Sequence, residues 1–145
     1  MSVRRILQSK GSADVLTIAR DAKVSDAAKI LSEKRVGALI VSEDGTTVQG
    51  ILSERDIVRE LGSRGTECMA DKVADLMTRN VITASPDDVA VDLLSKMTKG
   101  RFRHLPVVEE GRMIGVISIG DVVKFRIEEM ERENVALTDM IVGHG

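Results

Sequence analysis

Two stretches of the sequence decide the fold, Gly50-Ile-Leu-Ser-Glu-Arg-Asp56 and Gly115-Val-Ile-Ser-Ile-Gly-Asp121. Both carry Gly, Ser and Asp at the same spacing, and the similarity extends outward from them. A shift of 66 residues aligns residues 15–45 with the second half of the chain, and a shift of 65 does the same for residues 47–59. Of these 44 aligned pairs, 13 are identical, so the chain contains a duplicated unit.

The two copies predict the same order of elements, β-α-β-β-α, and the fold class is therefore α/β (α+β). Each copy begins with a short β-rich run, followed by a helix, two buried strands joined by a tight turn, and a second helix. The expected strands are residues 15–18, 38–41 and 49–52 in the first copy, and residues 81–84, 105–108 and 113–117 in the second.

Residues that favour helix ends set the expected helix bounds. Ser25 is the expected N-cap in the first copy, and Ser85 in the second, with Pro86 at the first helical position and Gly100 at the end. A second helix follows each strand pair. The residues expected at its start and on its buried face are Ser53, Ile57, Val58 and Leu61 in the first copy, and Ser118, Val122, Val123, Ile127 and Met130 in the second.

Composition excludes several classes of function. The 145 residues include 21 Lys or Arg, 23 Asp or Glu, and two Phe as the whole aromatic content, which disfavours nucleic-acid binding by bulk charge or by stacking. Cys68 is the single cysteine, so no intrachain disulfide forms. No apolar run approaches the roughly 20 residues of a membrane helix. We therefore expect a cytoplasmic protein with no nucleic-acid or membrane partner.

The repeat also predicts the domain organisation. The first unit is expected at residues 3–62 with a helical lead-in, a linker at 63–72, the second unit at 73–131, and a fraying tail at 132–145.

Three motifs carry a family resemblance: Val-Ala-Asp-Leu-Met-Thr at residues 73–78, Arg103-His-Leu-Pro-Val107, and Gly-x-x-Ser-x-x-Asp in both copies. Together with the element order, they resemble a tandem pair of CBS domains, or Bateman module, of the stand-alone bacterial type. The resemblance implies two units packed through their sheets with pseudo-twofold symmetry. It also implies clefts that bind AMP, ADP, ATP, NAD(H) or S-adenosylmethionine, association into homodimers, and regulation of an unidentified partner protein without chemistry of its own.

The Ser-x-x-Asp elements are the main candidate site. Ser118 opens a helix whose first free N–H groups suit a phosphate, and the carboxylate of Asp121 can accept hydrogen bonds from ribose hydroxyls. Ser53 and Asp56 offer the same pair in the first unit. An alternative interpretation is a capping box, in which both side chains only satisfy backbone donors.

Positive charge beside the phosphate is expected from Arg103 and His104 in the second unit, although His104 equally suits a satisfied interior position. The first unit has Gly37 and Ala38 at these places, and Arg55 is the candidate that compensates. We therefore expect the second-unit cleft to hold phosphate more tightly. The family pattern adds candidates for contacts with the adenine ring, namely Thr17, Ile18, Thr83, Ala84 and Pro106, and Ala38 is a further candidate ligand-binding residue.

These observations favour a sensor of adenine nucleotides over two alternatives, a structural or dimerisation module with degenerate clefts and a sensor that prefers NAD(H). An enzyme is disfavoured, because the sequence offers no nucleophile–base pair, no metal-ligand cluster and no Walker loop. No catalytic or metal-binding residue and no catalytic cofactor is therefore predicted.

Overall fold

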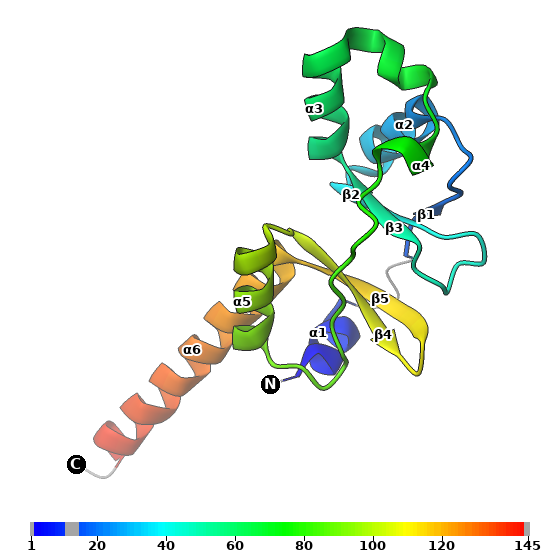
Figure 1. Cartoon of the computed structure of the whole chain (residues 1–145). Helices are drawn as coiled ribbons and strands as arrows, with labels where there is room; N and C mark the ends of the chain where they lie inside the picture. The colour runs from blue at the N-terminus through cyan, green and yellow to red at the C-terminus, as the bar shows by residue number, and fades with distance from the viewer. Residues whose placement is uncertain (1, 11–14, 144–145) are drawn as a thin grey trace.

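The computed structural model describes residues 2–10 and 15–143, with side chains up to residue 137, and it contains two stacked units (Figure 1). The first unit consists of β1(Thr17–Ile18), α2(Val24–Lys34), β2(Ala38–Val41), β3(Gly50–Ser53) and α3(Glu54–Arg64). The second consists of α5(Ala90–Gly100), β4(His104–Glu109), β5(Arg112–Ser118) and α6(Ile119–Gly143). The duplicated order of elements is confirmed, apart from one strand.

The first unit has a three-stranded sheet in the order β1-β2-β3. Strand β1 runs parallel to β2, and β2 is antiparallel to β3 with Leu39 opposite Leu52. The turn between β2 and β3 is fixed by Asp44, whose carboxylate accepts hydrogen bonds from the Thr46 and Thr47 amides and the Ser42 hydroxyl. These bonds hold the pKa of Asp44 well below its ordinary value.

The second unit lacks the strand expected at residues 81–84. Only Ala84 pairs there, in a single parallel bridge with Val107, and the sheet contains β4 and β5 alone. The reason is Pro106. In the first unit the Ile40 amide donates to the Leu16 carbonyl, whereas Pro106 at the matching position has no N–H to donate. The β4–β5 turn has Glu110 and Gly111 at φ 52° and 78°, which suits a tight two-residue turn.

Two predicted helix starts are wrong, because tertiary hydrogen bonds override the local capping signals. Helix α5 begins at Ala90, because the segment from Ser85 to Asp88 forms its own turn, whose Pro86 and Asp88 carbonyls accept hydrogen bonds from the amides of Arg4 and Val3. Helix α2 begins at Val24 rather than after Ser25, since the Val24 amide donates to the Asp71 carbonyl.

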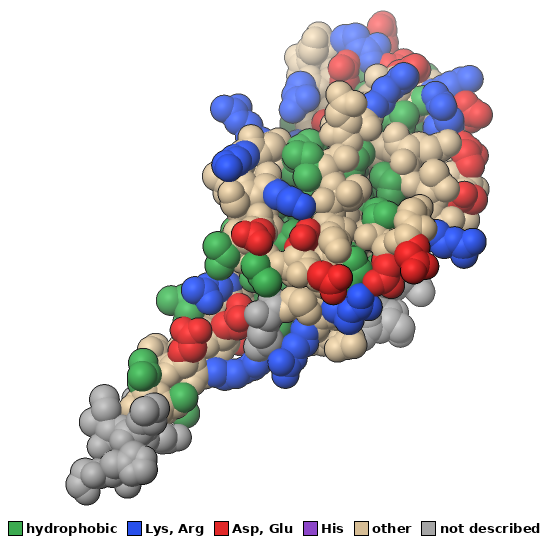
Figure 2. All heavy atoms as spheres, turned by 60° about the horizontal axis from the view of Figure 1, so that its bottom comes forward, with side chains coloured by type: hydrophobic (Ala, Val, Ile, Leu, Met, Phe, Trp, Pro, Cys, Tyr) green, Lys and Arg blue, Asp and Glu red, His purple; other side chains and the backbone are tan. Residues whose placement is uncertain are grey.

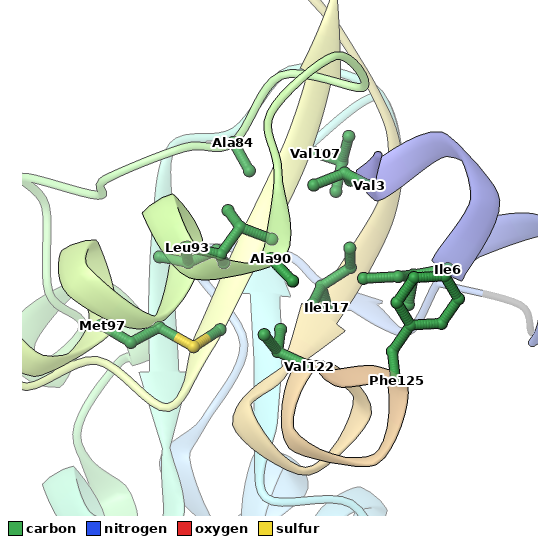
Figure 3. Close-up of a cluster of buried hydrophobic side chains, with 11 residues drawn as sticks. Val3, Ile6, Ala84, Ala90, Leu93, Met97, Val107, Ile117, Val122 and Phe125 are labelled. Carbon is green, nitrogen blue, oxygen red and sulfur yellow. The ribbon is translucent and has the colours of Figure 1, made fainter. Parts of the chain in front are cut away.

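The segments that precede the two units are exchanged. Helix α1(Val3–Ser9) packs on the second unit, where Val3 and Ile6 join a core that includes Val107, Ile117 and Phe125 (Figure 3). In return, the 3-10 helix η1(Gly65–Ala70) and helix α4(Val73–Leu76) lie against the first unit, and Val73 belongs to its core. The exchange ties each unit to the start of the other.

The units meet through their sheets, as expected. Ile40 and Ile51 of the first sheet form a third apolar cluster with Met113 of β5, and Val116 packs against it. The Met113 amide also donates to the Thr46 carbonyl at 2.8 Å. This aliphatic layer fixes how the two units face each other and therefore shapes the grooves at its edges.

Helix α6 continues as one helix to Gly143, through most of the expected tail, and projects beyond both units (Figure 1). Residues 144–145 lie outside the described part. Val122 and Phe125 are buried, but four side chains expected in the core are exposed, because no described element covers that side of their helices. They are Val58 on α3 and Val123, Ile127 and Met130 on α6. Within the described residues, no helix has the length and apolar character needed to cross a membrane.

Candidate ligand-binding clefts

Two clefts of similar size open between the units. Cleft 1, of about 340 Å³, joins the start of α3 to the segment that precedes β4. Cleft 2, of about 330 Å³, joins the start of α6 to the segment that precedes β2. Each cleft thus combines the Ser-x-x-Asp element of one unit with the opposite unit, as a twofold relation requires. Both volumes fall within the range of small-molecule sites.

In cleft 1 the Ser-x-x-Asp element is a complete capping box. Asp56 Oδ2 accepts hydrogen bonds from the amide and hydroxyl of Ser53, both at 3.0 Å, and the Asp56 amide donates to Ser53 Oγ at 3.3 Å. Asp56 Oδ1 accepts no hydrogen bond within the described residues, and the guanidinium of Arg59 lies 3.8 Å away. The element therefore caps the helix and still leaves one carboxylate oxygen for a ligand.

In cleft 2 the equivalent capping box, formed by Ser118 and Asp121, also binds a cation, Lys10. Asp121 Oδ2 accepts from the Ser118 amide at 2.9 Å, and also from Lys10 Nζ at 2.8 Å. Lys10 donates a second hydrogen bond to the Val116 carbonyl. Burial raises the pKa of Asp121, but the hydrogen bonds from Lys10 and Ser118 outweigh it, and the net pKa lies below the ordinary value.

The two clefts differ in charge. Four arginines line cleft 1, namely Arg55, Arg59, Arg101 and Arg103, together with the acidic Glu54 and Asp56. Arg59 lies near Asp56, whereas the other three arginines form no ion pair or side-chain hydrogen bond within the described residues. The described lining of cleft 2 has Lys10 and Arg35 as its cations, with Lys10 already paired, and its remaining lining is mostly aliphatic. Cleft 1 therefore suits an anionic group better than cleft 2 does.

His104 lies between the clefts and lines both of them. Its ring faces Gly37 of the other unit, where a Cβ would come within 3.1 Å of His104 Cε1. Burial lowers the pKa of His104 below 6.5, so the ring is mainly neutral at pH 7. A neutral imidazole at this position offers a hydrogen-bonding group to either cleft rather than a charge.

The structure regroups the residues predicted from the sequence. Cleft 1 contains Ser53, Arg55, Asp56, Arg103 and His104, and cleft 2 contains Ala38, His104, Ser118 and Asp121. Five candidates for adenine contacts line neither cleft: Thr17, Ile18, Thr83, Ala84 and Pro106.

From the sequence, Arg103 was grouped with Ser118 and Asp121 of the second unit, and the structure groups its side chain differently. The Arg103 carbonyl accepts from the Ile119 amide at 2.8 Å, yet its side chain lines cleft 1 with Ser53. Because each cleft lies between the units, the segment that precedes β2 or β4 in one unit lies in the same cleft as the capping box of the other unit.

Several of the residues that line the clefts were not predicted from the sequence. Arg35 and Arg101 are an identical pair of the repeat, and both have positive φ, at 54° and 57°. That pairing is the signal that could have found them. Thr78 ends the motif at residues 73–78 and forms backbone hydrogen bonds with Ile51 at the wall of cleft 1. Lys10 carried no signal, since the exchanged helix α1 brings it to Asp121 from 111 positions away.

Within the described residues, no three His, Cys, Asp or Glu side chains cluster in a way that could hold a metal ion.

Comparison with known proteins identifies the family. The model of the CBS domain matches residues 3–63 and again residues 73–128, so the chain belongs to the CBS-domain family. A curated relative, the mitochondrial CBS domain-containing protein CBSX3 of Arabidopsis thaliana, is 36% identical over 98% of this chain and 72% of its own length.

Solved structures show the same fold. The CBS-domain containing protein ATU1752 from Agrobacterium tumefaciens has a TM-score of 0.82 and 40% identity, covering 87% of this chain and 99% of that one. The CBS domain pair of protein MJ0100, in complex with 5′-methylthioadenosine and S-adenosyl-L-methionine, has a TM-score of 0.76 and 26% identity, covering 89% of this chain and 98% of that one.

Proposed function

We propose that this protein senses adenine nucleotides, and that cleft 1 is the site that binds the phosphate of an AMP-like ligand. The observation that carries the proposal is the convergence of Arg55, Arg101 and Arg103 on a cleft that also holds Asp56 Oδ1. A guanidinium binds phosphate oxygens through short charge-assisted hydrogen bonds, which are about twice as strong as neutral ones. The carboxylate oxygen is suited to ribose hydroxyls.

Cleft 2 suits an adenosine compound with little negative charge. Its aliphatic walls, which include Leu16, Ile40 and Val116, offer apolar contact to a flat base. A ribose that binds Asp121 shares that carboxylate with Lys10, which donates to its Oδ2 atom. We therefore expect weaker binding of nucleotides here than in cleft 1.

The similarity to the domain pair of MJ0100 supports an adenosine-type ligand, since that protein was solved with two adenosine compounds bound. We further propose that the compound bound by this chain is one of AMP, ADP, ATP and NAD(H). We also propose regulation: a ligand held between the units stabilises the arrangement that it contacts best, and a partner protein reads that arrangement. We assign no reaction to the chain. The cytoplasmic location and the homodimeric state of the protein stay predictions.

A panel of ligands tests the proposal. Thermal unfolding is measured with AMP, ADP, ATP, NADH, adenosine and S-adenosylmethionine, and calorimetry follows for the compounds that stabilise. A ligand at 100 times its Kd should raise Tm by roughly 5–10 °C. If none of these compounds shifts Tm or releases heat, the clefts are degenerate and the alternative of a structural module holds.

A further inference from the structure

The exposed face of helix α6 has a regular spacing. Val123, Ile127, Met130, Asn134 and Leu137 follow one another at intervals of four, three, four and three residues. This is the heptad spacing that places side chains along one stripe of a helix, at positions a and d. The four apolar members are between 42% and 57% exposed, so the stripe is open to solvent in the single chain.

The stripe is separate from the face that holds α6 to its own unit. Val122 and Phe125 face the core of the second unit and are at most 5% exposed. They anchor the first turns, and from there the helix projects away from the two units with hydrophobic side chains exposed along it (Figure 2). The helix is therefore already formed and held in place before anything covers its stripe.

Asn134 indicates what kind of partner covers the stripe. A single Asn at position a among apolar neighbours is characteristic of parallel two-stranded coiled coils, where two copies of the Asn pair across the axis. Such a residue specifies both the register and the number of strands, at a cost in stability. A partner with an apolar side chain at that level would leave the Asn134 amide unpaired, whereas a second copy supplies a matching Asn.

The flanking charges fit the same arrangement. Arg126 precedes Ile127 at position g, and Glu131 follows Met130 at position e. In a parallel pair, position g of one helix lies beside the next position e of its neighbour, so Arg126 meets Glu131 of the partner subunit. Within its own helix Arg126 lies 3.9 Å from Glu129, and its side chain is 36% exposed, which leaves it accessible to a second carboxylate.

We infer that α6 pairs with α6 of a second copy of this chain, in register and parallel, through the stripe at 123, 127, 130, 134 and 137. None of these five residues lines cleft 1 or cleft 2. The pairing stands independently of the proposed ligand.

The oligomeric state tests the inference, and the helix supplies a matched control. Leu137 and Val135 are 57% and 59% exposed, but only Leu137 belongs to the stripe. Sedimentation equilibrium should find wild type at twice the 15.8 kDa chain mass. Leu137→Glu should raise the dimer Kd at least about tenfold, whereas Val135→Glu should change it less than about twofold. A wild type that stays monomeric to roughly 1 mM, or a Leu137→Glu variant that dimerises normally, overturns the inference.

Cross-linking tests register and direction. In the parallel pair the two residues at 134 face each other, so Asn134→Cys should oxidise to a covalent dimer. Val135→Cys, one position further along, should stay uncross-linked under the same conditions. Cys68 is fully buried, and the wild type serves as the background. Cross-linking of Val135→Cys to an equal extent, or of neither variant, contradicts the parallel in-register arrangement.

Discussion

Clefts 1 and 2 have the same construction and different charges. Each consists of a Ser-x-x-Asp cap from one unit and a left-handed arginine, Arg101 or Arg35, from the other. The residues that position the backbone are the same in both clefts, whereas the other side chains that line the clefts differ. We conclude that the scaffold is shared by the two clefts, while the selectivity for ligands belongs to each cleft separately.

The largest expected effect is on phosphate binding in cleft 1. Arg103→Ala removes a charge-assisted hydrogen bond and should weaken AMP binding roughly 10- to 100-fold. Arg35→Ala removes one arginine from cleft 2 and serves as the matched control, with AMP binding in cleft 1 unchanged. Calorimetry measures both. Equal losses in the two variants would mean that the clefts do not differ as described.

A smaller effect concerns the shared scaffold. Ser53→Ala and Ser118→Ala each remove an acceptor for the amide three residues later, and each should lower the free energy of unfolding by about 1 kcal/mol. Urea unfolding measures the two values. Because both boxes are intact, the losses should agree within about 0.5 kcal/mol, and a large difference would show that one box is not a structural cap.

Salt should separate the clefts further. Added salt screens exposed arginines, so raising NaCl from about 50 to 500 mM should weaken AMP binding several-fold, while the binding of uncharged adenosine should change little. Calorimetry with the two ligands at both salt concentrations tests this. An equal dependence for AMP and adenosine would contradict the assignment of the phosphate to the arginines.

The smallest effect concerns His104. Its pKa is lowered by burial from 6.5, so unfolding allows the ring to take up a proton more easily than the folded state does. Its contribution to stability is therefore complete above pH 6.5 and is lost as the pH falls through and below that value. The Tm of wild type should decline between pH 7.5 and about 5.5 more steeply than the Tm of His104→Gln. Parallel declines would show that His104 does not titrate differently in the two states.

Much of the fold follows from the sequence, because the repeat and the turn residues are local signals. The bounds of β2 were predicted correctly, and both capping boxes lie at Ser53 and Ser118 as the repeat implied. The starts of α2 and α5 were missed, since hydrogen bonds with distant segments decide them. The Val24 amide donates to the Asp71 carbonyl, and the Pro86 and Asp88 carbonyls accept from the Arg4 and Val3 amides.

The composition of the clefts was harder to predict. A sequence repeat shows which residues are equivalent, but not that each cleft draws on both units. The sequence therefore grouped Arg103 with the Ser-x-x-Asp element of its own unit, whereas its side chain lines cleft 1. Lys10 was missed because helix α1, which packs on the second unit, brings it to Asp121. The expectation that the second-unit box holds phosphate more tightly is replaced by the proposal that cleft 1 does.

The most direct test is an AMP titration followed by backbone NMR. We expect the first amides to shift to be those of cleft 1, at Ser53, Asp56 and residues 101–104, with those of Ser118 and Asp121 responding only at higher AMP concentration. Saturation at Ser118 and Asp121 first, with cleft 1 unaffected, would contradict this expectation.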